Sequence, residues 1–309
     1  MNITEKSNQI IIEGIKDFNV SHIFDCGQCF RWNREADGRY TGIAFGKPAA
    51  LKFEPYEEGG FEGKLSIENI TEEEFQQYWQ DYLDLQQDYG QIKAVLAEKD
   101  PVMAEAIKSG QGIRILRQDP WETLISFIIS QNNNIPRIKK CIEALCEMFG
   151  KFTGSYNGKE YFAFPEAQVL AELSAEDLAP IRLGYRAKYI IETAKRVVAD
   201  DRNLGQGDDS QKERVRLKDF CQIDTLQGYE YLTSLCGVGP KVANCILLFG
   251  MAKYESFPID VWVRRVMNRL YGIDENDMKS MAKYADENFG QYGGIAQQYL
   301  FYHIRQLEK

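Results

Sequence analysis

Residues 235–262 bring together the side chains of this 309-residue chain that are best suited to covalent chemistry. Gly237 and Gly239 flank a single valine, and Lys241 follows two positions later. Asp260 comes nineteen residues after the lysine. A lysine amine can attack an electrophilic carbon, and a carboxylate near it can stabilise positive charge and move protons. The pair therefore indicates a candidate nucleophile with an electrostatic partner.

Both residues fall where the sequence predicts the start of a helix. Pro240 fits the first position of an apolar helix, which places Lys241 in its first turn. Amides of the glycine turn and of that first turn have no partner within the helix and can bind a phosphate. Pro258 and Asp260 repeat the signal before residues 261–272, with Asp260 as the N-cap. Capping alone would already account for the aspartate.

A lysine in the first turn of a helix needs a reason, because the helix dipole disfavours a cation there by about 0.3–1 kcal/mol. Holding a lysine neutral near pH 7 requires on the order of 3–5 kcal/mol, so burial must supply what the dipole does not. Val238, Val242, Cys245 and Ile246 predict a mostly apolar setting. The alternatives for Lys241 are a phosphate contact or a surface position, and the turn by itself leaves them open.

The cysteine and histidine residues predict no metal site. Cys26 and Cys29 have the spacing of a metal-binding or redox pair, and His22 could supply a third ligand. A fourth ligand is missing, because no second such pair exists and the other histidine, His303, lies near the end of the chain. Two histidines in all also disfavour metalloprotease and serine-triad chemistry. We expect neither a metal nor an organic cofactor.

Composition predicts a globular protein of two domains, with 44% hydrophobic residues. The N-terminal apolar stretch is interrupted by charges, and nowhere do 18 apolar residues run together. The sequence therefore predicts neither a signal peptide nor a membrane span. Seven cysteines without a disulfide-framework spacing fit a reducing compartment. We expect an intracellular monomer with no membrane partner.

The elements that must position the candidate residues fall into two parts. Alternating segments predict an antiparallel sheet in the first third of the chain. A capping-box pattern at residues 71–74 then opens a helix, and helical periodicity follows to the C-terminus. The predicted strands lie within 28–35, 39–45, 49–55 and 64–70, and the main predicted helices within 123–131, 136–150, 186–201, 239–250 and 259–272. Polar connections are predicted over 150–163 and 201–215.

Charge is unevenly distributed along the chain. The net charge is −9, which is unusual for a protein that binds nucleic acid. Residues 54–100 hold 13 acidic and 3 basic residues, so this segment accounts for more than the whole imbalance. Residues 178–199 carry a net charge of +4. A basic face on an acidic protein is consistent with local, salt-sensitive DNA binding, and a solvated amphipathic helix is the alternative.

The glycine turn, Lys241 and Asp260 together resemble the signature of the helix-hairpin-helix DNA glycosylases, and most closely their 8-oxoguanine DNA glycosylase/lyase branch. The resemblance extends in separate short motifs from Gly27 to Phe301. No cysteine follows Cys245, so the four-cysteine iron–sulfur loop of the endonuclease III and adenine-glycosylase branches is missing. The resemblance implies an α+β fold, with an N-terminal antiparallel, TATA-binding-protein-like β domain over 1–112. A mainly helical glycosylase domain over 113–309 would follow.

The resemblance implies a repair reaction on duplex DNA. An enzyme that removes a base must extrude the nucleotide from the helix and read it in a pocket. Lys241 would attack the sugar carbon C1′ while Asp260 stabilises the cationic sugar, and the resulting Schiff base would permit strand cleavage by β-elimination. The expected substrate is 8-oxoguanine, opposite cytosine.

The resemblance also assigns the residues that read the damaged base. In 8-oxoguanine N7 carries a hydrogen and becomes a donor, so the carbonyl of Gly27 would gain a hydrogen bond that guanine cannot offer. Gln297 would read the Watson–Crick edge, since an amide both donates and accepts. Phe301 and Cys245 would enclose the flipped base, and Pro258 would line its pocket. Without the resemblance, Phe301 and Cys245 would be taken as core residues.

A third group of residues is expected to hold the DNA around the gap. By resemblance, Asn132, Arg137 and Arg186 would contact the unpaired cytosine, and Tyr185 would wedge between base steps. Gly237 and Gly239 would bind the DNA backbone through their amides. Without the resemblance, the asparagine run would be read as a polar turn that caps the next helix.

The chain departs from the family pattern at three positions. Trp262 stands where better-known members carry a histidine, Gln131 precedes the asparagine run, and Phe249 takes a position often held by methionine. These departures affect contacts with the DNA backbone, pocket packing and opposite-base choice. Two alternative functions are a monofunctional alkylbase glycosylase, which typically lacks the lysine, and a non-catalytic DNA-binding module, which needs only the glycine turn.

Overall fold

The computed structural model describes residues 2–98, 100–203, 217 and 222–308. The chain forms two compact units. The sheet unit comprises Met1–Ala44, Pro48–Arg117 and Tyr254–Lys309, and the helical unit comprises Phe45–Lys47 and Gln118–Lys253. From residue 204 on, the predicted connection over 201–215 lies outside the described residues. Within the described residues, no helix combines the length and apolar character needed to cross a membrane.

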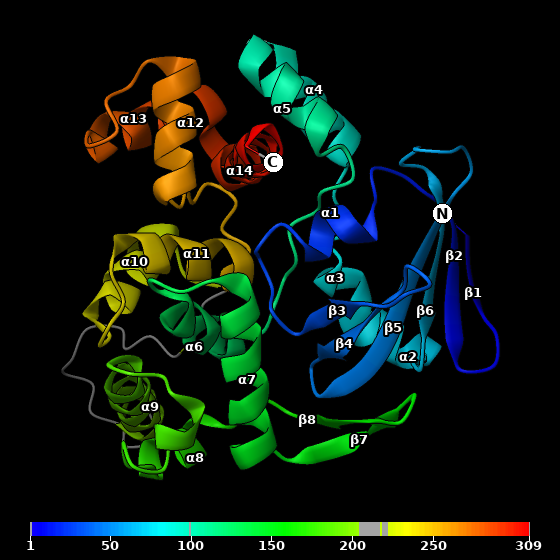
Figure 1. The fold of residues 1–309 in the computed structure, drawn as a ribbon. Helices are drawn as coiled ribbons and strands as arrows, with labels where there is room; N and C mark the ends of the chain where they lie inside the picture. Colours follow the sequence, from blue (N-terminus) through cyan, green and yellow to red (C-terminus); the bar gives the residue numbers. More distant parts are fainter. Residues whose placement is uncertain (1, 99, 204–216, 218–221, 309) are drawn as a thin grey trace. The chain divides into compact units, whose positions relative to one another are not determined.

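The N-terminal part folds into a six-stranded sheet with the order β1-β2-β6-β5-β4-β3 (Figure 1). The predicted antiparallel arrangement is confirmed by the pairing of β1 with β2, β2 with β6, β5 with β6, and β3 with β4. The strands are β1 (Asn2–Glu5), β2 (Gln9–Ile15), β3 (Trp32–Arg34), β4 (Tyr40–Ala44), β5 (Lys47–Pro55) and β6 (Gly63–Glu68).

Two features of the sheet differ from the predicted strands. β1 and β2 were not predicted, although Ile10, Ile12 and Ile15 of β2 are fully buried. The predicted strand over 28–35 is shortened to β3, because Gln28 is buried and bonded away from the sheet. Its Nε2 donates to the carbonyls of Ile23 and Arg114, both at 2.9 Å. A side chain that satisfies buried carbonyls in this way stabilises a loop instead of a strand.

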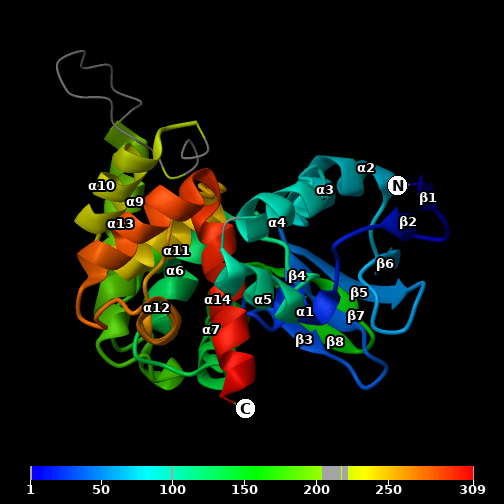
Figure 2. The same ribbon diagram turned by 90° about the horizontal axis from the view of Figure 1, so that it is seen from above.

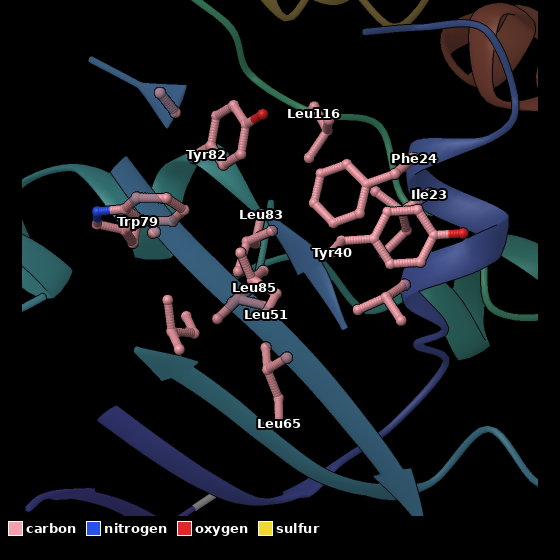
Figure 3. Packing of buried hydrophobic residues seen from close by; sticks show 14 of the residues in the cluster. Ile23, Phe24, Tyr40, Leu51, Leu65, Trp79, Tyr82, Leu83, Leu85 and Leu116 are labelled. Carbon is pink, nitrogen blue, oxygen red and sulfur yellow. The ribbon is translucent and has the colours of Figure 1, made fainter. Parts of the chain in front are cut away.

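The core of the sheet unit lies between the sheet and the short elements that follow it (Figure 3). Phe24 packs against Tyr40, with ring centroids 5.4 Å apart, and Trp79 meets Tyr82 edge to face at 5.6 Å. Aromatic pairs at these spacings add to the hydrophobic stabilisation of the core. The elements are α1 (Val20–Phe24), α2 (Glu72–Glu74), the π-helical turn Phe75–Trp79 and α3 (Gln80–Tyr82). The predicted capping box at the start of α2 is confirmed.

Two helices that follow the sheet and three C-terminal helices complete the sheet unit. Helix α14 packs against α5 and α12, and Figure 2 shows α14 running beside α5. These helices are α4 (Tyr89–Glu98), α5 (Pro101–Ser109), α12 (Val261–Tyr271), α13 (Met278–Phe289) and α14 (Gly293–Leu307), with a 3-10 turn at Gly290–Tyr292. Sequence-distant segments therefore share one compact unit.

The helical unit is built around α6, which packs against α7, α9 and α11. Its helices are α6 (Pro120–Ser130), α7 (Ile135–Phe149), α8 (Ala167–Glu172), α9 (Arg186–Asn203), α10 (Thr225–Ser234) and α11 (Pro240–Met251). A 3-10 turn at Ala179–Ile181 precedes α9. The predicted helices over 123–131, 136–150, 186–201 and 239–250 correspond to α6, α7, α9 and α11.

The predicted connection over 150–163 is instead a β-hairpin. Strands β7 (Phe152–Tyr156) and β8 (Lys159–Phe162) pair antiparallel (Figure 1). Asn157 and Gly158 join them, both with positive φ, at 51° and 78°. Asn-Gly is the residue pair that a two-residue hairpin turn favours, because both central positions need left-handed backbone.

A buried arginine ties the sheet unit together. Arg114 is only 5% exposed and its guanidinium donates to the carbonyls of Asp17 at 3.1 Å, Asp84 at 2.8 Å and Lys16 at 2.9 Å. The guanidinium carbon lies 4.6 Å from the centroid of the Tyr89 ring. These contacts link the segment after α5 to the end of β2 and the end of α3.

We predict that Arg114→Leu lowers the free energy of unfolding by about 3 kcal/mol, because several buried carbonyls lose their donor at once. Urea denaturation measures the change. Lys108→Leu is the control, since Lys108 forms an exposed pair with Glu105 and its loss should cost less than about 0.5 kcal/mol. Equal effects of the two substitutions would contradict the role assigned to Arg114.

Candidate active site

Lys241 occupies the first turn of α11, as predicted. Gly239 is the N-cap of this helix and Pro240 is its first residue. The Lys241 side chain is half-buried, and its Nζ lies 5.1 Å from the centroid of the Phe127 ring. Phe127 is itself stacked on Phe249, with centroids 5.6 Å apart. The amine therefore lies over the Phe127 ring, a residue that the sequence did not indicate.

Cys245 lies one helical turn after the lysine and is 3% exposed. The residues around it on α11 are buried and apolar, among them Val242 and Ile246. The predicted apolar setting of the lysine helix is thus confirmed. Residues four apart share a helix face, so Lys241 and Cys245 lie on the same side of α11.

The turn before α11 uses its two glycines differently. Gly237 has φ +77°, and a Cβ there would lie 2.4 Å from the Tyr189 ring. Only glycine combines that backbone conformation with so close an approach. Gly239 has extended backbone, with φ −93° and ψ 179°, and nothing would lie within 4 Å of an added Cβ. The glycine requirement of the turn therefore rests on Gly237.

Two of the three predicted cytosine contacts, Asn132 and Arg137, and the predicted wedge Tyr185 are exposed on the helical unit. Asn132 is exposed and has φ +45°, just before α7. Arg137 is also exposed, and its Nη2 donates to the Arg182 carbonyl at 3.0 Å. Tyr185 is 51% exposed, which leaves an aromatic ring available to contact a base. Asn134 caps α7, so the polar-turn interpretation also holds for this member of the run.

Arg186, by contrast, is 5% exposed and serves the backbone of its own unit. Its Nη1 donates to the Leu183 carbonyl at 3.2 Å, and its Nη2 donates to the Asn132 carbonyl at 3.0 Å. Nε and Nη2 also bond to the carbonyl of Gln131. The guanidinium thus shapes the loop that carries Asn132. A direct contact of Arg186 with cytosine stays a prediction.

Asp260 is the N-cap of α12 in the sheet unit, as predicted. Its Oδ1 accepts a hydrogen bond from the amide of Val263 at 2.8 Å. The side chain is half-buried, and Pro258 two residues earlier is buried. Trp262, one of the departures from the family pattern, lies under the Arg265 guanidinium at 4.9 Å. A carboxylate that caps a helix is held in one orientation, which suits an electrostatic role.

Gln297 carries an unusual polar atom. The side chain lies on α14 and is 4% exposed, and among the described residues its Oε1 has no hydrogen-bond partner. A buried acceptor without a partner costs about 1–3 kcal/mol, so such atoms are rare in folded proteins unless a ligand satisfies them. The atom is therefore free to accept a hydrogen bond.

Gly27 and Phe301 are brought together within the sheet unit. A Cβ at Gly27 would lie 3.7 Å from Cε1 and Cζ of the Phe301 ring, and Gly27 has φ +81°. The ring of Phe301 is half-buried and lies 5.2 Å below the Arg305 guanidinium. The backbone of Gly27 and the Phe301 ring therefore lie side by side.

The cysteine pair near Gly27 belongs to this loop. The Cys26 thiol donates to the Ile23 carbonyl at 3.2 Å, and the Gln298 amide donates to its sulfur at 3.4 Å. Burial raises the pKa of the Cys26 thiol to about 12. Cys29 is a buried member of the sheet-unit core. Among the described residues, no three His, Cys, Asp or Glu side chains form a metal-binding group.

The predicted site residues thus form two sets, each within one compact unit. The helical unit holds eight of them, namely Asn132, Arg137, Tyr185, Arg186, Gly237, Gly239, Lys241 and Cys245. The sheet unit holds the other five, namely Gly27, Pro258, Asp260, Gln297 and Phe301. The first set carries the amine and the exposed turns, and the second carries the carboxylate, the orphan amide oxygen and the aromatic ring.

Comparison with protein families identifies the class. Residues 125–290 match the model of the HhH-GPD superfamily of base excision DNA repair proteins, so this chain belongs to that superfamily. Residues 10–124 match the N-terminal domain of 8-oxoguanine DNA glycosylases, which assigns the chain to the 8-oxoguanine glycosylase type within it. The predicted family and fold class are confirmed.

Individual relatives agree with this assignment. A solved structure of the Clostridium acetobutylicum 8-oxoguanine glycosylase/lyase with double-stranded DNA containing cytosine opposite 8-oxoguanine is 40% identical, with a TM-score of 0.90 over 100% of this chain and 99% of that chain. The N-glycosylase/DNA lyase of Saccharomyces cerevisiae is 44% identical over 169 residues, which cover 54% of this chain and 44% of that protein. A probable N-glycosylase/DNA lyase of Methanothermobacter thermautotrophicus is 29% identical over 94% of this chain and 95% of that protein.

We predict that Gly237→Ala destabilises the protein by about 2–4 kcal/mol, from the left-handed backbone and the clash with Tyr189 together. Thermal denaturation followed by circular dichroism measures the loss. Gly239→Ala is the matched control for stability, because its backbone is extended and the space beside it is open. If both variants melt with the wild type, the close approach at Gly237 does not constrain the turn.

Proposed function

We propose that this protein is a bifunctional DNA repair enzyme that excises 8-oxoguanine from duplex DNA and cleaves the strand at the resulting abasic site. The observation that carries the proposal is the position of Lys241 in the first turn of α11. This helix directly follows the Gly237–Gly239 turn, here called the glycine hairpin, and the Lys241 amine lies over the Phe127 ring. The name of the Clostridium relative, a glycosylase/lyase solved with 8-oxoguanine opposite cytosine, supports the choice of substrate.

In the proposed reaction, the amine nitrogen of Lys241 attacks C1′ of the damaged nucleotide. The new N–C1′ bond forms as the glycosidic bond breaks. The electron pair of the glycosidic bond leaves with the base, which takes up a proton. The nitrogen then loses a proton, and the C1′–O4′ bond breaks as the ring oxygen takes up a proton, which leaves a cationic Schiff base between Lys241 and C1′. Its positive charge acidifies C2′, so removal of a C2′ proton expels the 3′ phosphate by β-elimination. The carboxylate of Asp260 stabilises the positive charge that develops at the sugar.

Recognition of the base is assigned to the sheet unit together with Cys245. The carbonyl of Gly27 accepts the hydrogen that N7 carries only in 8-oxoguanine, while guanine presents a lone pair there. The buried Oε1 of Gln297 accepts from an N–H donor of the Watson–Crick edge, which gives this orphan atom its missing partner. On the family resemblance, we assign further contacts with the base to Phe301, Pro258 and Cys245.

DNA around the extruded nucleotide is assigned to the helical unit. Asn132 and Arg137 present exposed donors and acceptors for the unpaired cytosine, with Arg186 shaping the loop beside them. Tyr185 wedges into the stack, and the amides of the Gly237–Gly239 turn hold a phosphate. We propose that the enzyme works as an intracellular monomer without a cofactor.

We predict that Lys241→Gln abolishes covalent capture. With borohydride, the wild type should form a stable adduct with duplex DNA containing 8-oxoguanine opposite cytosine, because borohydride reduces a Schiff base to an amine. Lys241→Gln should give no adduct. An adduct in this variant would exclude Lys241 as the nucleophile. Release of the base by the wild type without any adduct would instead favour a monofunctional glycosylase, and binding without release would favour a non-catalytic module.

We predict that Asp260→Asn separates the two roles of this residue. Asparagine caps a helix about as well as aspartate, so the melting temperature should change little. The single-turnover rate of base excision should fall by about 10²–10³-fold, because the charge that stabilises the transition state is gone. Full activity of Asp260→Asn would reduce Asp260 to a structural cap.

A further inference from the structure

One side chain joins the loop that carries Asn132 to the glycine hairpin. Gln131 lies directly after α6, and its Nε2 donates to the Gly237 carbonyl at 2.9 Å and to the Ile128 carbonyl at 3.2 Å. Gln131 and Gly237 are 106 residues apart in the sequence, and both belong to the helical unit. The residue is one of the three departures from the family pattern noted above.

Helix α9 supports both segments from one face. Arg186, its first residue, donates to the carbonyls of Gln131 and Asn132. Thr193, two turns further along, donates from Oγ1 to the Cys236 carbonyl at 2.9 Å. Positions 186 and 193 fall on the same face of a helix. The backbone beside Asn132 and the backbone before α11 are therefore both bonded to α9. The Gln131 side chain adds a direct bond between these two segments.

We propose that Gln131 is a positioning residue that makes the Asn132 loop and the glycine hairpin a single body, so that engagement of the opposite base fixes the helix that carries Lys241. The inference rests on the proposed function. Its consequence is that opposite-base choice is expressed in the rate of the chemical step. A nucleophile displaced by a small distance loses much of its rate, so a bond that fixes its helix affects turnover directly.

The chemistry of the amide suits this role. Gln131 faces two carbonyl oxygens, and an amide NH₂ group offers two donors. Asn133, two residues later, makes a comparable bond that stays local, since its Nδ2 donates to the Ile129 carbonyl at 3.1 Å. The two residues therefore provide a matched pair, because both bind the end of α6 and Gln131 also reaches the hairpin.

The test compares Gln131→Met with Asn133→Leu. Single-turnover excision is measured at saturating enzyme on duplexes with 8-oxoguanine opposite cytosine and opposite adenine. For Gln131→Met, the ratio of the cytosine rate to the adenine rate should fall by about fivefold, which is the value of one net hydrogen bond of about 1 kcal/mol. Asn133→Leu should keep the wild-type ratio. Gln131→Ala removes the same donor without adding an apolar side chain and should match Gln131→Met.

A second measurement tests the coupling itself. In an Asn132→Ala background, the opposite base is no longer read by the loop, so Gln131→Met should change the ratio no further. Rates that fall equally opposite both bases, or an unchanged ratio in the Gln131 variants, would overturn the inference, as would a wild type that excises equally opposite both bases. A wild type that fails to excise 8-oxoguanine at all would instead overturn the proposed function.

Discussion

The helical unit depends on the backbone turn at Gly237. Its left-handed conformation and its contact with the Tyr189 ring leave no room for a side chain, so the start of α11 is determined by packing against α9. The carbonyls of Cys236 and Gly237 then bond to side chains from α9 and from the end of α6. These contacts fix the start of α11, and with it the position of Lys241. A nucleophile on a helix terminus is only as well placed as the turn before it.

The sheet unit shows how polar groups are divided between structure and recognition. Gln28 and Arg114 are buried and satisfy carbonyls from several segments, and the Gln28 bonds tie the loop after α1 to the segment after α5. Gln297 is also buried, yet its Oε1 has no partner in the part of the chain that the structure describes. Buried polar groups with hydrogen-bond partners stabilise a fold. A buried acceptor without a partner destabilises it until a ligand donates a hydrogen bond. The contrast between these side chains supports the reading role proposed for Gln297.

Local features were predictable from the sequence, and pairings between distant segments were not. The start of α11 at Pro240, the cap at Asp260 and the capping box of α2 depend on a few neighbouring residues, and all are as predicted. Strand β2 was missed, because its partner β6 lies far along the chain, and β1 was missed although it pairs with β2, its neighbour in sequence. The β7–β8 hairpin was also missed, although Asn157 and Gly158 mark its turn. Tertiary pairing decides which apolar segment becomes a strand.

The sequence by itself determined the family and the register of Lys241 and Asp260, because these depend on residue types and on their spacing along the chain. Only the tertiary structure decided that Arg186 serves the carbonyls of the Asn132 loop and that Gln131 reaches Gly237. The same holds for the burial of Gln297 without a partner for its oxygen. Burial and hydrogen-bond satisfaction arise from contacts between residues far apart in the chain, and no local pattern encodes them.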